Sequence, residues 1–296
     1  MRNLCRKVPE KDYTYKMKTK KNIKYTLIVI IALVTAIYNF LNPPNENYPL
    51  SIRYIDVSQG DSSLILLPNG ETMLIDAGEN KYSNNVVREL NKLNIHKIDH
   101  LIATHPHSDH IGGMERIINN YQIGNIYMPK TEHTSKTYLD MLESISDNKL
   151  QITTARAGLT IIDDGELKAE FVAPSEDYYE EINNYSAVLK LTYKENTFLF
   201  CGDIEALVEK EILSNGYDIA SDVLKVSHHG SYRSTSDAFL NAVNPQYAVI
   251  SCGKDNEYGH PHREILQKLK SITVLRTDKT GTITLYSDGK KITEAE

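Results

Sequence analysis

Three histidines and one aspartate lie within the six-residue string HPHSDH at residues 105–110. Imidazole nitrogens and carboxylate oxygens are the ligands that zinc and similar divalent ions take in proteins. The string follows an apolar segment and precedes two glycines, so it is predicted to end a strand and open a helix. Four ligands in that space can divide between two adjacent ions. We therefore expect His105, His107, Asp109 and His110 to form such a centre rather than a solvated turn.

More polar side chains follow apolar segments farther along the chain. Seven of the ten histidines lie at the ends of predicted strands, which is where α/β scaffolds present ligands and catalytic groups. Randomly scattered histidines would not favour strand ends. Beyond the first string, the candidates are Asp203 after residues 198–201, His228 and His229 after 223–226, and His260 and His262 after 248–251.

The elements that must position these residues follow from apolar periodicity and turn residues. Strands followed by helices, twice over, predict an α/β fold with two sheets between helical layers. Short strands are expected within residues 150–173. The other expected strands are 51–57, 62–67, 72–76, 98–103, 124–128, 186–194, 197–201 and 281–287, and the expected helices include 83–94, 111–120, 134–147 and 262–270.

The series resembles the metallo-β-lactamase superfamily and, within it, the hydrolase domain of ComEC-type DNA-uptake proteins. DVSQGDS at residues 56–62 is close to a DVGQGDS signature, with Ser58 in place of its first glycine. NNYSAVL at 183–189 resembles an NNxSxVL strand, and HHGS at 228–231 matches an HHGS motif. The resemblance covers roughly residues 50–287. It implies an αββα sandwich with the site on the rim where its two halves meet.

The resemblance also implies a ligand set for two ions. His105 and His107 would bind the first ion, Asp109 and His110 the second, and Asp203 would bridge both. Asp109 is thus expected to take part in catalysis as well as in metal binding. The alternative role for Asp203 is to cap a helix that starts at residue 204.

Four downstream histidines have alternative assignments. His229 is expected to complete the shell of the second ion and His228 to face the substrate, although the two roles could be exchanged. Both are not expected to be core residues, because adjacent side chains on an ending strand point to opposite sides. His260 and His262 could donate a proton or hold an anionic oxygen. His262 could equally be only the first residue of the helix 262–270.

A third histidine for the first ion is missing from its usual place. Only His133 lies between the HPHSDH string and Asp203, and the aligned position falls at residues 183–186. The resemblance therefore implies a weaker, oxygen-richer first site that prefers manganese over zinc. Asp76, Asn184 and Ser186 are expected to support the ligands, with a simple Asp–Gly turn as the alternative role of Asp76.

The amino-terminal part differs from the rest in composition. Residues 1–24 hold nine basic and two acidic side chains, and residues 25–41 are uncharged. A run of 17 residues is at the short end of the membrane-spanning range of about 17–25. We expect a cytoplasmic arm at 1–24, a retained transmembrane signal-anchor at 25–41 and a polar linker at 42–49. The domain at 50–296 would then lie outside the cell membrane.

Charge weighs against tight nonspecific binding of nucleic acid. The whole chain carries −6, and residues 1–24 carry +7, so the remaining residues carry −13. Such a surface repels polyanions unless metal ions and local basic groups offset it. Cys201 and Cys252, each beside a site motif, are expected to be buried thiols rather than a disulfide.

Three classes of function fit the pattern. The first is a hydrolase of phosphodiesters that uses two divalent ions, zinc or manganese, to activate a water; its substrate would be DNA, or a cell-wall phosphodiester such as a phosphorylcholine ester. The second is a β-lactamase, disfavoured by the bridging position of Asp203 and the missing third histidine. The third is a non-catalytic scaffold, against which the intact ligand set argues. No protein partner can be inferred.

Overall fold

Two β-sheets form the centre of the protein in the computed structural model, which describes residues 50–295. The first sheet has eight strands in the order β15-β14-β1-β2-β3-β4-β5-β6. Its strands are β1 (Leu50–Tyr54), β2 (Ser63–Leu66), β3 (Thr72–Ile75), β4 (Lys97–Ile102), β5 (Gln122–Met128), β6 (Ile152–Thr154), β14 (Ile283–Ser287) and β15 (Ile292–Glu294). β3 to β6 run parallel to one another, and the remaining pairs are antiparallel.

The second sheet has seven strands in the order β13-β12-β11-β10-β9-β8-β7. They are β7 (Thr160–Asp163), β8 (Leu167–Ala173), β9 (Val188–Tyr193), β10 (Asn196–Phe200), β11 (Val223–Lys225), β12 (Tyr247–Ile250) and β13 (Thr273–Arg276). β10 to β13 are parallel, so their carboxyl ends meet at one edge of the molecule.

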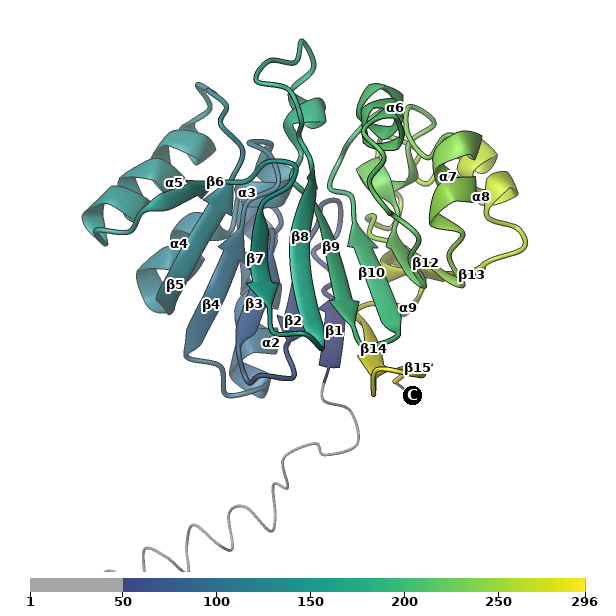
Figure 1. The fold of residues 1–296 in the computed structure, drawn as a ribbon. Coiled ribbons are helices and arrows are strands. Elements are labelled where there is room, and N and C mark those ends of the chain that lie inside the picture. The colour runs from purple at the N-terminus through teal and green to yellow at the C-terminus, as the bar shows by residue number, and fades with distance from the viewer. Residues whose placement is uncertain (1–49, 296) are drawn as a thin grey trace, which may run out of the picture. The chain divides into compact units, whose positions relative to one another are not determined.

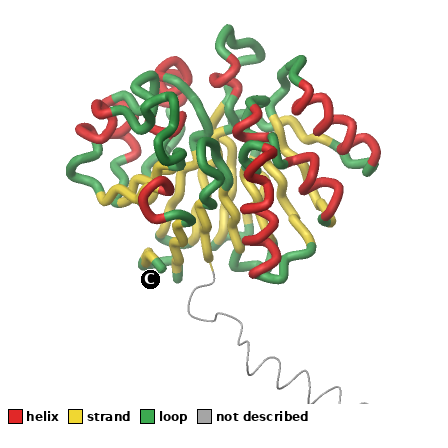
Figure 2. Tube along the Cα trace, turned by 180° about the vertical axis from the view of Figure 1, so that it is seen from behind, coloured by secondary structure: helices red, strands yellow, loops and turns green. Residues whose placement is uncertain are grey.

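Helices cover the outer face of each sheet, as Figures 1 and 2 show. The first half contributes α2 (Ser83–Lys92), α3 (Ser108–Ile111), α4 (Met114–Asn120) and α5 (Lys136–Asp147), and the second α6 (Ala206–Ser214), α7 (Asp237–Val243), α8 (Arg263–Lys268) and α9 (Thr277–Thr280). Short 3-10 turns are η1 (Asn80–Tyr82), η2 (Ile182–Tyr185) and η3 (Ser227–Gly230). This arrangement confirms the predicted αββα sandwich.

The apolar pattern of the strands explains the layers. On β10, Phe198 and Phe200 belong to the cluster between the two sheets, whereas Leu199 packs into the cluster beneath α6 and α7. Successive side chains of a strand point to opposite faces, so a strand covered on both faces is apolar throughout. A third cluster lies between the first sheet and α2, α4 and α5.

The structure corrects the predicted helix 111–120. It is divided into α3 and α4, and the two glycines at the junction lie against the segment before η1. A Cβ on Gly112 would lie 2.4 Å from Asn80 N, and one on Gly113 would lie 2.4 Å from Ala77 O. The glycines therefore let the HPHSDH loop pack directly on residues 77–80, the segment that follows β3. β15 was not anticipated from the sequence.

The membrane-spanning prediction concerns residues that the structure does not describe. The arm 1–24, the apolar segment 25–41 and the linker 42–49 all lie outside the described range. Among residues 50–295, no helix has the length and apolar character needed to cross a membrane.

Candidate metal centre

The candidate ligands gather where the carboxyl ends of strands from both sheets meet. β4 leads into the HPHSDH string, β10 into Asp203, β11 into His228 and His229, and β12 into the segment with His260. In Figure 1, α3 and the start of α6 lie at this same end of the molecule. Side chains that are up to 155 positions apart in sequence, from His105 to His260, thereby line one region.

His110 is oriented from behind by Asp76. The ring Nδ1 donates to Asp76 Oδ2 at 2.7 Å, and Asp76 also accepts hydrogen bonds from the backbone N and the Oγ1 of Thr104, at 2.9 and 2.7 Å. A proton fixed on Nδ1 leaves the lone pair of Nε2 directed away from Asp76. Asp76 thus supports a ligating imidazole, and it is more than an Asp–Gly turn.

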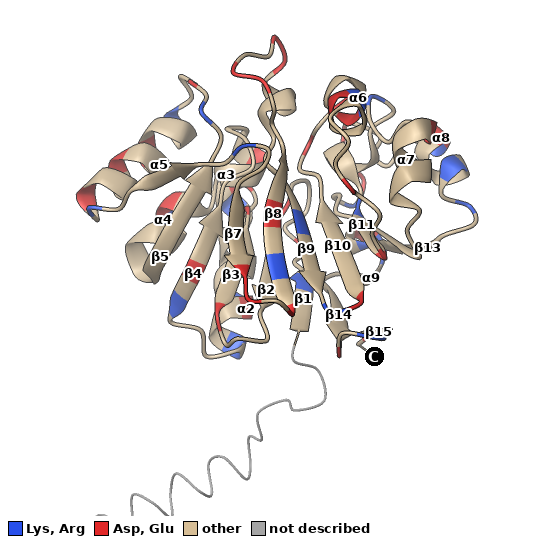
Figure 3. Cartoon of the chain, viewed as in Figure 1, with Lys and Arg blue, Asp and Glu red and all other residues tan. Residues whose placement is uncertain are grey.

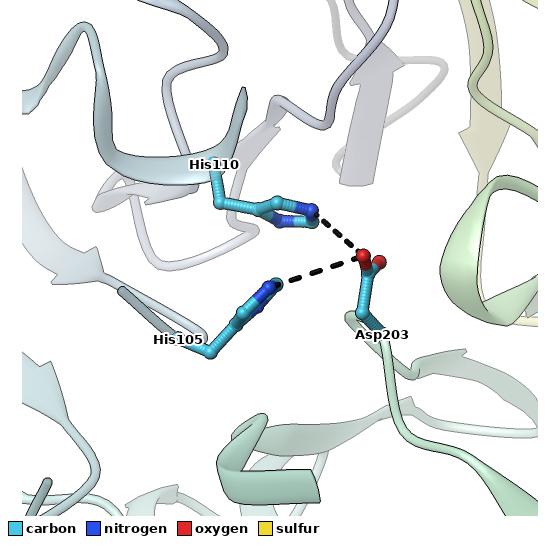
Figure 4. Close-up of side chains that lie close together, drawn as sticks. All are labelled: His105, His110 and Asp203. Carbon is cyan, nitrogen blue, oxygen red and sulfur yellow. Dashed lines mark ion pairs between the residues drawn. The ribbon is translucent and has the colours of Figure 1, made fainter. Parts of the chain in front are cut away.

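The first group of candidates consists of His105, His107 and Asp203. His105 Nε2 lies 3.0 Å from His107 Nδ1 and 3.9 Å from Asp203 Oδ2. Figure 4 shows His105 and His110 pointing toward the carboxylate of Asp203. On the far side of the His105 ring, Nδ1 lies 3.3 Å from Ser186 Oγ, which also accepts a hydrogen bond from Asp203 N.

The second group consists of Asp109, His110, His229 and Asp203. His229 Nε2 lies 3.2 Å from Asp109 Oδ2 and 3.5 Å from Asp203 Oδ2, and His110 Nε2 lies 3.3 Å from the same Asp203 oxygen. His229 Nδ1 donates to the carbonyl of Ser251 at 3.0 Å, which directs Nε2 toward the carboxylates of Asp109 and Asp203. Asp203 Oδ2 therefore lies between the two groups.

Asp203 is not the cap of a helix. α6 begins at Ala206, and Glu205 occupies the N-cap position. The structure thus rejects the alternative role of Asp203. The carboxylate of Asp203 is buried among imidazoles instead.

The reasoning that placed His228 and His229 on opposite sides of a strand was wrong. Neither residue is extended: φ is 51° at His228 and 55° at His229, inside η3. Because both lie in the left-handed region, both rings turn toward Asp203 rather than alternating. His228 Nε2 lies farther out, 4.0 Å from Asp203 Oδ2, and it lines the open side of the site.

The buried carboxylates of this cluster favour positive charge on the neighbouring histidines, and hence the binding of a cation. Burial alone would lower the pKa of His110, but the carboxylates of Asp203, Asp76 and Asp109 raise the pKa well above its usual value. The pKa of His229 is likewise raised, against its burial, mainly by Asp203 and Asp109. Burial lowers the pKa of His105 and of His107, so these two rings stay neutral.

Orphaned buried atoms show that the residues fit metal ions. His110 Nε2 and Asp203 Oδ1 are buried without a properly oriented hydrogen-bond partner among the described residues. A buried polar atom without a partner is costly, and a divalent ion between these groups would satisfy it. The ligand atoms of His105, His110 and Asp203, and those of Asp109, His110 and His229, lie within 4.8 Å of one another, which fits a site for two such ions. His107 is in neither cluster; its Nδ1 lies 3.0 Å from His105 Nε2.

Asp61 lies close to His229 but is already paired. Lys225 Nζ contacts both of its carboxylate oxygens, at 2.7 and 2.8 Å, and both side chains are buried. The neighbouring Gly60 has φ +135°, and a Cβ there would lie 2.2 Å from Asp109 O. The DVSQGDS motif therefore packs directly against the HPHSDH loop and connects it to β11 through the Asp61–Lys225 ion pair. Ser58, which replaces a glycine of the signature, has φ 61°.

Residues 183–186, where the resemblance places the missing third histidine, make structural contacts. Asn184 Oδ1 accepts the hydrogen bond of Glu205 N at 3.0 Å, and Ser186 contacts Asp203 and His105. Asn184 thus fixes the segment after Asp203. The ring centroid of His133 lies 6.4 Å from that of His107. The Nδ1 of His133 accepts a hydrogen bond from Ser135 Oγ at 2.9 Å.

A cavity of about 280 Å³ opens over the cluster and is lined in part by Asp109, Asp203, His228, His229 and His260. His260 Nδ1 lies 3.4 Å from the side-chain nitrogen of Gln59, whose oxygen accepts the hydrogen bond of Gly253 N. Gln59 must therefore donate to His260 Nδ1, which leaves the ring proton on Nε2.

His262 does not line the cavity but contacts His260, which does. It is the N-cap residue of α8 rather than its first turn, and its Nδ1 accepts the hydrogen bond of Tyr232 N at 3.2 Å. Its ring lies edge-on to that of His260, with centroids 4.9 Å apart. His262 thus flanks the cavity through His260.

Sequence reasoning missed Lys225 and Tyr258 as parts of the site, whereas it placed Gln59 among structural or near-site polar groups. Lys225 stood out as a cation at the end of an apolar strand, directly before the two histidines. Gln59 lay inside the recognised signature, although no contact could be assigned to it. Tyr258, which lines the cavity, carried no signal beyond its place two residues before His260.

Cys201 and Cys252 are both buried and unpaired. Burial raises the pKa of both thiols. They behave as inert core residues.

Comparisons with known proteins agree with this geometry. Residues 55–254 match the model of the family described as the metallo-beta-lactamase superfamily. The chain is 32% identical over 248 residues to ComE operon protein 3 of Bacillus subtilis, and 30% identical over 245 residues to competence protein ComA of Neisseria gonorrhoeae. These matches cover 77% and 81% of the chain. The chain spans about a third of the length of each relative, 32% in both cases.

Solved structures share the fold at low sequence identity. The metallo-beta-lactamase fold protein YhfI from Bacillus subtilis aligns with a TM-score of 0.50 at 10% identity, over 83% of this chain and 100% of that one. CmlA, a diiron beta-hydroxylase from Streptomyces venezuelae, aligns with a TM-score of 0.51 at 14% identity, over 80% of this chain and 54% of that one. At these identities the likeness shows the fold alone.

Proposed function

The chain belongs to the metallo-β-lactamase superfamily, and on that premise we propose that it hydrolyses phosphodiesters, with a DNA strand as the favoured substrate. It is a hydrolase of the competence-protein type with a buried His/Asp metal site. The observation that carries the proposal is the position of Asp203 Oδ2 between the two ligand groups. A shared carboxylate suits two adjacent ions, which is the arrangement that in-line displacement at phosphorus uses.

The proposed ligands are His105, His107 and Asp203 for one ion, and Asp109, His110, His229 and Asp203 for the other. Two divalent ions held there, manganese or zinc, would supply an activated water and stabilise charge on the phosphoryl oxygens. Asp76 and the carbonyl of Ser251 keep the lone pairs of His110 and His229 directed at the site.

Two further histidines, His260 and His228, line the cavity, and we assign them different roles in the reaction. His260 presents an Nε2–H because Gln59 occupies its Nδ1, so it can donate a hydrogen bond to an anionic oxygen. Burial and the nearby His229 lower the pKa of His260 to about 4, which keeps the ring neutral. His228, on the open side, is placed to meet the leaving group.

DNA is favoured over a cell-wall phosphodiester by the relatives. One matched relative is named competence protein ComA and the other ComE operon protein 3, although the chain covers only a third of each. The net charge of −13 outside residues 1–24 is the observation that favours the second candidate, a wall phosphodiester of the phosphorylcholine type, because a small head group is repelled less than a polyanion. A β-lactamase activity and a non-catalytic scaffold are less well supported.

A substrate panel tests the proposal. The full-length chain would be assayed with manganese or zinc against single-stranded DNA, bis-p-nitrophenyl phosphate, p-nitrophenyl phosphorylcholine and a cephalosporin, with Asp203→Ala as the inactive control. We expect hydrolysis of the first two. Preference for the choline ester would select the second candidate, cephalosporin hydrolysis alone would overturn the proposal, and a metal-free, inactive preparation would indicate a scaffold.

We also propose that residues 25–41 anchor the chain in the cell membrane with the catalytic domain outside. The basis is the uncharged run with nine basic residues before it. Protease added to intact cells should then digest the domain. Protection in intact cells together with digestion after lysis would contradict this topology.

A further inference from the structure

Four aromatic rings form a row, and two of them, Tyr258 and His260, line the cavity. Tyr258 stacks on His260 with centroids 5.6 Å apart and an interplanar angle of 21°, His260 meets His262 at 4.9 Å, and His262 meets Tyr232 at 4.9 Å. The two tyrosines at the ends of this aromatic row are 59% and 65% exposed. A large aromatic side chain left open beside a catalytic cavity is a candidate for substrate contact.

Tyr258 has one covered face and one open face. His260 covers the inner face in a nearly parallel stack, and the 59% exposure of the residue leaves the outer face to solvent. Tyr258 also lines the same 280 Å³ cavity as Asp109, Asp203 and His229. A planar group stacked on this tyrosine would therefore lie beside the phosphoryl group that the metal-activated water would attack.

The support beneath Tyr258 is rigid before any ligand arrives. Gln59 contacts the ring of His260, and Asn256 binds both the backbone N and the backbone O of His260, at 2.9 and 2.6 Å. Asn256 also donates to the carbonyl of Gly253 at 2.9 Å, which closes the loop on itself. A platform that is already ordered binds a flat ring at little entropic cost.

The charges around the site do not supply a basic track for a polyanion. Among the described residues near the aromatic row, Lys254 and Arg263 are offset by Asp255, Glu257 and Glu264. Arg233, which follows Tyr232, is paired with Glu181 and Glu205. The connection between β8 and β9 carries four exposed acidic residues, Glu176, Asp177, Glu180 and Glu181 (Figure 3). Contacts to the bases must then supply what phosphate contacts do not.

We propose that Tyr258 is a stacking platform for an unpaired nucleobase next to the scissile phosphodiester, so that the substrate is a single-stranded nucleic acid. The inference rests on the proposed phosphodiesterase function. A base inside a duplex is already stacked on both faces, so an aromatic platform favours an unpaired strand.

Matched oligonucleotides and variants test the platform. The full-length chain with manganese would be assayed on a single-stranded oligonucleotide, on its duplex, and on a strand in which abasic residues replace the bases. Tyr258→Ala should lower kcat/KM for the base-containing strand by roughly 5- to 150-fold, the range for one lost base stack, and leave the abasic strand unchanged. Tyr258→Phe should keep the wild-type rate, because it keeps the ring.

A binding measurement gives a readout that does not need turnover. Quenching of 2-aminopurine in a single strand by the metal-free chain should be lost in Tyr258→Ala and kept in Tyr258→Phe. Tyr178→Ala is the matched control, because Tyr178 is 77% exposed but lines a different cavity; it should behave as wild type in both assays.

The outcomes separate this inference from the proposed function. Equal rates for wild type and Tyr258→Ala on the base-containing strand, or faster cleavage of the duplex than of the single strand, would overturn the platform and leave a phosphodiesterase. Hydrolysis of p-nitrophenyl phosphorylcholine in preference to every strand would overturn it in favour of a choline ester. A chain that cleaves no phosphodiester would remove both the proposed function and the platform.

Discussion

Lys225, the last residue of β11, and Asp61, which follows β1, form a buried ion pair between the two halves of the sandwich. Lys225 Nζ lies 2.7 Å from Asp61 Oδ1 and 2.8 Å from Oδ2. The same carboxylate is 3.7 Å from His229 Nδ1, and Asp61 N donates to Asp109 O at 3.1 Å. The pair thus joins the strand that carries His229 to the loop that carries Asp109.

Removing the lysine alone is expected to be costly. In Lys225→Met, the carboxylate of Asp61 stays buried without its partner, which typically costs about 3–5 kcal/mol of the free energy of unfolding. Adding Asp61→Asn removes the uncompensated charge and should recover most of that loss. Urea unfolding of the metal-free single and double variants measures both. Equal stability of Lys225→Met and wild type would show that the pair contributes nothing.

Asp203→Ala is expected to abolish hydrolysis and reduce the bound metal. Its Oδ2 lies between both ligand groups, so without it two cations would face each other uncompensated. Losing several kcal/mol of transition-state stabilisation corresponds to a decrease of about 1,000-fold or more in kcat. Metal analysis of the purified variant is the second measurement. An unchanged rate with unchanged metal content would contradict the bridging role.

Manganese is expected to support a higher rate than zinc. The proposed first ligand group has two imidazoles and a carboxylate but no third histidine, so oxygen ligands such as water would complete its shell, and added oxygen ligands favour harder ions. Chelation should also remove one ion before the other. Stepwise dialysis against a chelator, with metal content and rate followed together, measures this. Two zinc ions retained through dialysis, with no gain from manganese, would contradict it.

Asn184→His is not expected to add a metal ligand. The amide oxygen of Asn184 accepts the hydrogen bond of Glu205 N, so the substitution loses that contact and should reduce stability by about 1 kcal/mol. Metal stoichiometry and thermal unfolding distinguish the outcomes. Tighter metal binding at unchanged stability would show instead that residue 184 can reach the first ion.

The metal-free protein is expected to be most stable near pH 6.5. The pKa values of His110 and His229 are raised, so their contribution is complete below the unfolded value, about 6.5, and is lost as pH rises through the raised values. The pKa values of His105 and His107 are lowered. Their contribution is therefore present above about pH 6.5 and is lost as pH falls through the lowered values.

Thermal unfolding between pH 5 and pH 9, with and without manganese, checks this dependence. The alkaline decline should disappear with manganese, because an ion replaces the protons on His110 and His229 and binds more tightly as they leave. A melting temperature of the metal-free protein that rises steadily from pH 6.5 to pH 9 would contradict the assignment.

The sequence alone determined the layers and the identity of most candidate ligands. Apolar runs on strands such as 198–200 required burial on both faces, and the spacing of His105, His107, Asp109 and His110 required a compact turn. These are local properties, since periodicity and turn chemistry act over a few residues. Apolar segments likewise preceded Asp203 and the histidines near 228 and 260, and the resemblance then assigned ligand roles to the set.

Tertiary structure decided which side chains meet and how each is oriented. The left-handed backbone at His228 and His229 turned both rings inward, where an extended strand would have separated them. Tertiary structure also decided the contact of Asp61 with Lys225, 164 positions apart, and the stacking of Tyr258 on the ring of His260. Such contacts depend on how two sheets pack, and no periodicity within one segment encodes the distance between two strands that are far apart in the chain.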